Sequence, residues 1–127
     1  MSFDLDEKFL LAAELAAGAR LPESYRATML RSNGGAVHVC GEDWEQYPIR
    51  DPSDRKRLSR TASHVLQETQ SLRDWPRFPA NALAIAGNGA GDQLVFIREG
   101  EVFSPAVLVW RHESGETEVA AADFSDI

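Results

Sequence analysis

One stretch decides the fold of this 127-residue chain: Ala84-Ile85-Ala86-Gly87-Asn88-Gly89-Ala90-Gly91-Asp92-Gln93-Leu94-Val95-Phe96-Ile97. Two short apolar runs, residues 83–86 and 94–97, lie on either side of a glycine-dense turn. Both runs are too short for independent helices, and the second is rich in β-branched and aromatic residues, which predicts strands. The glycines permit positive φ angles, so the chain can reverse here. We therefore expect a hairpin whose apolar strands are buried in the middle of a sheet.

Helical patterns precede this hairpin. Asp4 or Asp6 can cap a first helix, which ends at Gly18. Its core face is expected at residues with helical spacing: Leu5, Phe9, Ala12 and Ala16. A second helix has Pro22 as its first residue and ends at residues 33–35, with a left-handed residue. A third helix is predicted from a cap at Ser53 or Asp54 through residue 72, with a core face on Leu58, Ala62, Val65, Leu66, Thr69 and Leu72.

Strands are predicted over residues 36–40, 106–110 and 117–119. Residues 42–54 read as an ordered loop or a ragged edge strand, residues 98–101 as a turn, and residues 120–127 as the first turns of a terminal helix with Phe124 pointing inward. Helices first and strands later indicate an α+β fold, with N-terminal helices packed on a mostly antiparallel, curved sheet. The length predicts a single domain spanning residues 1–127.

Composition restricts the classes of partner. The formal net charge of −7 favours a cationic partner and disfavours nucleic acid or an anionic membrane. The charge is uneven, because residues 50–77 carry 7 basic and 4 acidic side chains. Cys40 is the one cysteine, which excludes an internal disulfide and fits a reducing compartment. The acidic start is unlike a signal peptide, and no apolar run is long enough for a membrane span, so we expect a cytoplasmic protein.

The glycine turn does not form a nucleotide-binding motif. The G-x-G-x-x-G pattern needs glycine where Asp92 stands and a helix where residues 94–97 predict a strand. Asp92 and Asn88 together offer too few oxygens for a hard cation. We expect Asp92 to stabilise the turn instead, and we expect neither a cofactor nor a metal.

His38 and Cys40 resemble a nucleophile with its base, but the spacing opposes this interpretation. Residues i and i+2 on a strand lie about 6.6 Å apart, beyond hydrogen-bond reach. The pair also lacks the spacing of a structural zinc site. His64 or His112 could approach Cys40 only through tertiary folding. The expected roles are a half-buried cysteine and an ordinary strand histidine, and no catalytic residue is predicted.

An acidic segment with aromatic residues follows the first predicted strand. Aromatic rings among like charges suit a protein-binding surface, because the rings bury area and the charges steer a partner. The alternative is an ordinary acidic loop with Trp44 in the core. The segment after Trp110 carries the same two interpretations. The candidate partner-binding residues are Glu42, Asp43, Trp44, Glu45, Glu99 and Glu101.

Further motifs occur in a fixed order: Leu21-Pro22-x-x-Tyr25, Asn33-Gly34-Gly35, Phe78-Pro79, Ile85-Ala86, Gly89, Gly91-Asp92, Pro105-Ala106-Val107, Trp110 and Ala122-Asp123-Phe124. This order resembles the SUKH superfamily, which includes yeast regulators of cell-wall assembly and killer-toxin resistance. The resemblance covers nearly the whole chain, although residues 42–77 match only as an insert with a helix. It implies helices packed on a curved antiparallel sheet. It also implies structural roles for Leu21, Pro22, Tyr25, Asn33, Gly34, Gly35, Gly89, Gly91, Asp92 and Trp110.

The resemblance also carries a functional expectation. Bacterial members of the superfamily are largely immunity proteins that bind and neutralise toxins, often nucleases. It therefore implies a non-catalytic module whose partner is a cognate toxin domain. An acidic inhibitor can occupy the basic cleft of a nuclease. The alternatives are a regulatory or scaffolding module with another protein partner, and a small enzyme that uses Cys40, His38 or Asp92. The oligomeric state is left open.

Overall fold

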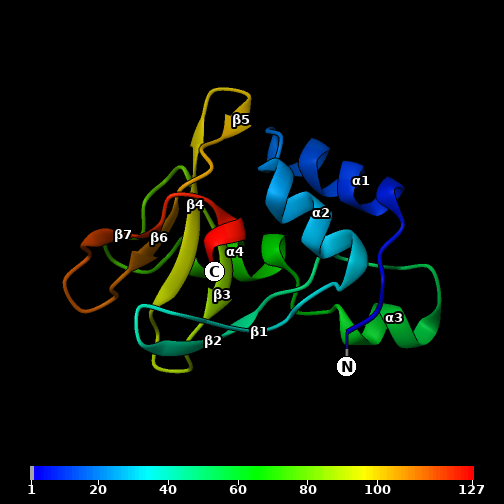
Figure 1. The fold of residues 1–127 in the computed structure, drawn as a ribbon, viewed down its shortest axis with the longest axis horizontal. Helices are drawn as coiled ribbons and strands as arrows, with labels where there is room; N and C mark the ends of the chain where they lie inside the picture. The colour runs from blue at the N-terminus through cyan, green and yellow to red at the C-terminus, as the bar shows by residue number, and fades with distance from the viewer. Residues whose placement is uncertain (1) are drawn as a thin grey trace.

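The computed structural model describes residues 2–127, which form helices packed against one curved sheet (Figure 1). In chain order the elements are α1 (Glu7–Ala17), α2 (Glu23–Arg31), β1 (Gly35–Val39), β2 (Glu42–Gln46), α3 (Arg55–Arg60), α4 (Val65–Leu72), β3 (Ala82–Gly87), β4 (Gln93–Glu99), β5 (Val102–Phe103), β6 (Val107–Trp110), β7 (Thr117–Ala121) and the 3-10 helix η1 (Phe124–Asp126). The strand order is β1-β2-β3-β4-β6-β7, with β5 paired to β4, and each of these pairs is antiparallel. The predicted α+β fold class is confirmed.

The predicted hairpin, β3 and β4, forms the centre of the sheet. Leu83 lies opposite Phe96, and a bulge interrupts the ladder between Ala84 and Ala86. Residues 82–86 are all buried because both faces of the sheet are covered. Side chains such as Phe96 join the larger core on one face, whereas Val95 joins a smaller cluster on the other.

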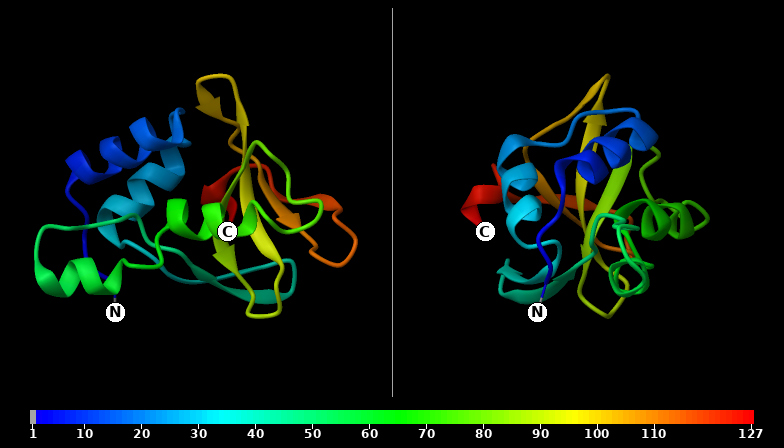
Figure 2. Two further views of the ribbon diagram at one scale, coloured as in Figure 1. Left: turned by 180° about the vertical axis from the view of Figure 1, so that it is seen from behind. Right: turned by 90° about the vertical axis from the view of Figure 1, so that its right-hand side faces the viewer.

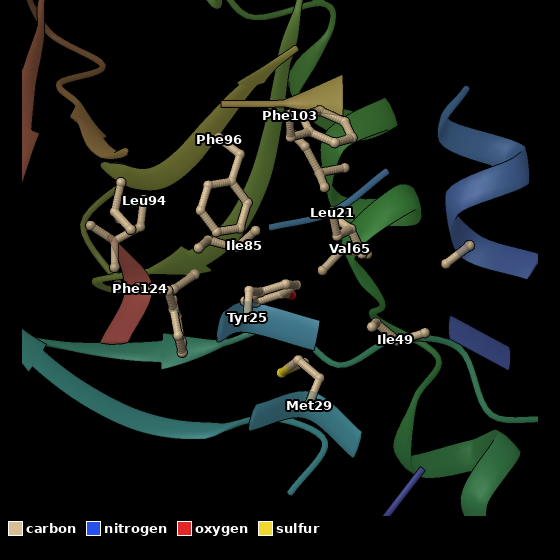
Figure 3. Packing of buried hydrophobic residues seen from close by; sticks show 14 of the residues in the cluster. Leu21, Tyr25, Met29, Ile49, Val65, Ile85, Leu94, Phe96, Phe103 and Phe124 are labelled. Atoms are coloured by element: carbon tan, nitrogen blue, oxygen red, sulfur yellow. The ribbon is translucent and has the colours of Figure 1, made fainter. Parts of the chain in front are cut away.

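The larger core lies between the sheet and the helices α1, α2 and η1 (Figure 3). Tyr25 of α2 makes edge-to-face contacts with Phe96, at 5.0 Å between ring centroids, and with Phe124, at 5.1 Å. Phe124 therefore points inward, as predicted. The prediction of a longer terminal helix was wrong. Ala121 pairs with Val107, so the residues up to Ala121 belong to β7, and only the short η1 follows.

Helix α1 has the predicted ends but not the predicted core face. Asp6 caps its start and Gly18, with φ 76°, caps its end. The buried helix residues are Leu10, Ala13 and Glu14, whereas the predicted core residues Ala12 and Ala16 are exposed. The rotation of α1 follows from its contact with α2, which pairs Glu14 with Arg26.

Helix α2 begins one residue later than predicted, because Pro22 is its N-cap. It ends at Arg31, and its C-cap Ser32 is extended, with a φ of −150°. The positive φ angles predicted for residues 33–35 occur at Gly34 and Gly35, after the cap. Tyr25 and Met29 are both buried. Asn33 then fixes the following loop, donating through Nδ2 to the Ile49 carbonyl and accepting through Oδ1 from the Ile49 N–H, both at 2.8 Å.

The predicted third helix is divided into α3 and α4. Thr61 ends α3, where its hydroxyl donates to the Arg57 carbonyl and accepts from the Asp51 N–H, both at 2.9 Å. His64 then caps α4 through its side chain. Helix α3 buries no side chain, so the prediction of Leu58 as a core residue was wrong, with 41% of its surface exposed.

Strand β2 lies between β1 and β3, so it is neither an irregular loop nor an edge strand. It pairs with β3 only near Glu45, which lies opposite Gly87. Farther along β3, helix α4 lies beside the strand (Figure 2), and Thr69 Oγ1 accepts from the Ala84 N–H at 2.8 Å. A side chain of α4 thus accepts a hydrogen bond from a backbone N–H in the part of β3 that does not pair with β2.

Residues 98–101 were predicted as a turn, but β4 continues to Glu99 and pairs back with β5. Glu99 lies opposite Val102 in this short hairpin. The hairpin projects beside the C-terminal end of α1 (Figure 1). There, Arg98 Nη1 donates to the Ala17 carbonyl at 3.0 Å.

Candidate functional site

Three turns contribute charged side chains to one end of the sheet: the β1–β2, β3–β4 and β6–β7 turns, at residues 40–41, 88–92 and 111–116. Asn88 joins the first two turns, donating through Nδ2 to Glu42 Oε1 at 3.1 Å. Antiparallel pairing explains their proximity, because it returns alternate turns to the same end of a sheet. We call this region the acidic sheet end and define it by Glu42, Asp43, Asn88, Asp92, Arg111, His112, Glu113, Glu116 and Glu118.

Arg111 is the central cation of the acidic sheet end. Its Nη1 donates to Glu42 Oε2 at 2.9 Å and to Asp92 Oδ2 at 3.1 Å, and its Nη2 donates to Glu118 Oε1 at 3.4 Å. The hydrogen bond to Glu42 is the main reason that the pKa of Arg111 is raised, so this side chain stays charged. Three carboxylates share one guanidinium, which leaves an excess of negative charge for a basic partner.

Asp92 joins the β3–β4 and β6–β7 turns. Its Oδ1 lies 2.7 Å from His112 Nδ1 and accepts from the His112 N–H at 3.1 Å. Burial raises the pKa of Asp92, but the hydrogen bonds from His112, Arg111 and Asn88 together outweigh burial and lower the pKa to about 2. Asp92 is therefore a carboxylate whose acceptor capacity is used within the fold.

Gly91 allows the two turns to approach each other. Its φ of 105° lies in the region that glycine adopts most readily. A Cβ atom at this position would lie 2.9 Å from His112 Nδ1. The ring of Trp75 lies on the same histidine, with centroids 5.8 Å apart. The position of His112 thus depends on the absence of a side chain at residue 91.

The candidate binding residues of β2 do not share one face. Asp43 and Glu45 are exposed, and Asp43 Oδ1 lies 2.7 Å from His38 Nδ1. Trp44 is only 1% exposed and belongs to the core, so it does not offer its ring to a partner as predicted. The alternative placed Trp44 in the core correctly but expected a loop where β2 forms. Alternation along the strand explains this result. Glu42 remains partly exposed, with 33% of its side-chain surface accessible.

Glu99 and Glu101 lie at the opposite end of the sheet, around the β4–β5 turn (Figure 1). Both residues are exposed. The β4–β5 turn and the β3–β4 turn lie at opposite ends of β4. The six candidate residues therefore do not form one continuous surface.

Sequence reasoning missed Arg111, Asn88 and Glu118 as members of this cluster. The segment after Trp110 was recognised as ambiguous, but its partner Glu42 lies 69 positions earlier in the chain. Only the strand order brings these residues together. A prediction of that order, combined with the charges at each turn, would have located the cluster.

Cys40 lies at the tip of the β1–β2 turn, with φ 56°, and is followed by Gly41 with φ 73°. The thiol is exposed, so the prediction of a half-buried cysteine was wrong. Strand β1 ends at Val39, and the turn moves Cys40 out of the sheet.

Within residues 2–127, no three or more histidine, cysteine, aspartate or glutamate side chains are grouped so that they could hold a metal ion. Among the described helices, none combines the length and apolar character needed to cross a bilayer.

Several residues expected to be structural are deeply buried, including Leu21, Tyr25 and Trp110. Trp110 Nε1 donates to the Arg77 carbonyl at 3.1 Å in the smaller core cluster. Gly34 has a φ of 114°, and its carbonyl accepts from Gln46 Nε2 at 3.2 Å. The first contact joins β6 to the segment between α4 and β3, and the second joins the residue before β1 to β2.

The fold and the acidic sheet end define an α+β protein whose charged surface is built on the turns of an antiparallel sheet. The model of the SMI1 / KNR4 family (SUKH-1) matches residues 4–127. The chain belongs to this family, which confirms the resemblance seen in the motifs. A comparison with curated proteins found no match.

Proposed function

We propose that this protein is a non-catalytic immunity protein that binds and neutralises a cognate bacterial toxin. Family membership across residues 4–127 carries the proposal, because the family includes toxin immunity proteins. The partner would present a basic surface, such as the active-site cleft of a nuclease, to the acidic sheet end. The protein would act in the cytoplasm, where a nuclease toxin meets its substrate.

The charges of the acidic sheet end support this choice of surface. The Asp43 side chain is 90% exposed and that of Glu118 is 62% exposed, so both can reach a partner. Arg111 holds Glu42 and Glu118 in place before any partner arrives. Such preorganisation lowers the entropy lost on binding, and exposed like charges accelerate association with a basic partner.

The test is co-expression with the toxin encoded by the neighbouring gene. The double variant Asp43→Lys/Glu116→Lys reverses two exposed charges that make no ion pair with Arg111. It should slow association with the toxin by about tenfold or more at low salt and reduce protection of the cell. The matched control Glu99→Lys/Glu101→Lys makes the same charge change at the opposite end of the sheet and should retain protection.

Each other outcome has a distinct meaning. Equal killing with and without the protein would reject the immunity proposal for that toxin. Loss of protection in the Glu99→Lys/Glu101→Lys variant alone would move the binding surface to the β4–β5 turn. If affinity capture returned housekeeping proteins and no toxin, a regulatory or scaffolding role would replace immunity.

A further inference from the structure

A groove of about 560 Å³ lies between the end of α1, helix α4 and the strands β3 and β5. Leu66, Leu83 and Phe103 contribute apolar surface to its lining. On α1, the residues that line the groove are the small Ala16 and Ala17, which leave its space unfilled. The groove lies at the end of β3 and β4 that is remote from the acidic sheet end.

The charges of the groove are opposite in sign to those of the protein as a whole. Arg73 and Arg98 are the charged residues in its lining, in a chain whose net charge is −7. Within residues 2–127, neither arginine has a carboxylate within ion-pair distance. The lining of the groove is therefore positive, although the adjoining β4–β5 turn carries the exposed Glu99 and Glu101.

Backbone carbonyls hold both guanidinium groups in place. Arg73 Nη1 donates to the Pro79 carbonyl at 3.1 Å. Arg98 donates through Nη1 to the Ala17 carbonyl and through Nε to the Gly100 carbonyl, both at 3.0 Å. A guanidinium has five N–H donors, so each arginine keeps donors for an incoming anion. Both side chains are also exposed, which gives such an anion access.

We propose that this groove binds an acidic, extended peptide segment of a partner protein. Carboxylates of the segment pair with Arg73 and Arg98, and a short apolar side chain packs against Leu66, Leu83 and Phe103. Charge complementarity selects this occupant, because the groove combines apolar surface with two arginines that form no ion pair with a carboxylate among residues 2–127. The groove is open to solvent, so a chain can enter and leave it.

This binding site is independent of the proposed immunity function. An acidic segment would be repelled by the acidic sheet end and attracted by the arginines of the groove. Its negative charge therefore favours binding in the groove. The protein would then offer a second binding site, lined by two arginines, at the end of β4 opposite to the acidic sheet end. Failure of either proposal leaves the other intact, because each uses a different probe.

The direct test measures binding of a peptide to the full chain by fluorescence anisotropy. The probe is a rhodamine-labelled ten-residue peptide in which aspartate alternates with valine and alanine. It should bind saturably, and its affinity should fall by about tenfold when salt rises from about 0.05 M to 0.3 M. The matched peptide with asparagine in place of aspartate should bind at least about tenfold more weakly.

Variants locate the binding. Arg73→Gln and Ala16→Trp should each weaken binding by about fivefold or more, the first by removing charge and the second by filling the groove. Arg31→Gln removes the same charge from an exposed position on α2 outside the groove and should leave the affinity unchanged. Arg98→Gln is tested with a thermal unfolding control, because Arg98 also contacts the end of α1.

The proposal is overturned by any of four results. The first is the absence of saturable binding of the acidic peptide up to about 1 mM. The second is equal binding of the aspartate and asparagine peptides. The third is an affinity unchanged in both Arg73→Gln and Ala16→Trp. The fourth is displacement of the peptide by octanoate at an affinity equal to or higher than that of the peptide, which would assign the groove to a small carboxylate.

Discussion

Glu14 of α1 and Arg26 of α2 form a buried ion pair, with 3.1 Å between Oε2 and Nε. Each side chain is only 9% exposed. The same oxygen of Glu14 accepts from the Leu21 N–H at 2.7 Å. One carboxylate therefore joins α1, the connection after it and α2. This arrangement explains why a charged residue, and not the apolar Leu11 or Leu15, faces the interior.

Glu14→Ala should lower the free energy of unfolding by about 3 kcal/mol, because it leaves Arg26 without its closest counter-charge and the Leu21 N–H without an acceptor. Urea unfolding measures the loss. The control is Glu23→Ala, which removes a carboxylate that is 74% exposed, pairs with Arg20 and reaches Arg26 only at 3.9 Å. It should change the free energy of unfolding by less than about 1 kcal/mol. Similar losses in the two variants would contradict a dominant role for the buried pair.

Asp92 should make stability depend on acid pH. Its pKa is about 2 in the folded protein and near 3.8 ordinarily, so its contribution is complete above about pH 4 and is lost as the pH falls towards 2. The contribution is at most about 2 kcal/mol. Urea unfolding of wild type and Asp92→Asn between pH 6 and pH 2 measures it. The variant should show a smaller pH dependence in this window, and identical slopes would reject the assignment.

Gly89→Ala and Gly91→Ala together separate the backbone strain of a side chain at positive φ from the steric clash with His112. Gly89 has a φ of 82° and open space around its Cα, so alanine there should cost about 1 kcal/mol from the backbone alone. At Gly91 alanine must also displace the His112 ring, so the loss should be larger by about 1 kcal/mol or more. Thermal unfolding measures both, and NMR of the His112 ring should detect displacement only in Gly91→Ala.

Cys40→Asn should stabilise the protein by about 0.5 kcal/mol. Residues 40 and 41 both have positive φ, as in a type I′ turn, for which Asn-Gly is the preferred sequence. The thiol is exposed, so no packing is lost. Urea unfolding under reducing conditions is the measurement, with Cys40→Ser as the control. A loss of stability in Cys40→Asn would show that the thiol makes contacts that outweigh the turn preference.

The sequence predicts those parts of the fold that depend on local patterns. Both strands of the central hairpin follow from short apolar runs beside glycine. The caps of α1 follow from Asp6 and Gly18. The break between α3 and α4 was not predictable in this way, because Thr61 ends α3 through a bond with Asp51, and that bond exists only after the intervening loop has folded.

The candidate site was harder to predict than the fold. Glu42 and Asp43 were proposed from their charge and from the aromatic residues beside them, whereas the burial of Trp44 depends on which face of β2 meets the core. Arg111 gained its role only from the strand order, which brings it to Glu42 and Asp92. A single sequence shows which residues follow one another along the chain. A charge cluster depends on which distant residues become neighbours in the folded protein, and the sequence pattern does not show this.

The chain leaves the sheet after Gln46, and the Val65 N–H at the start of α4 donates to the Pro48 carbonyl at 2.9 Å. This hydrogen bond joins the two ends of the excursion, which is the segment of residues 49–64 that includes α3. Changes in the length or sequence of α3, which buries no side chain, need not disturb the strand register, since loop length is tolerated when the ends stay together. Relatives can therefore diversify this excursion, and acquire new recognition properties there, without redesigning the scaffold that carries it.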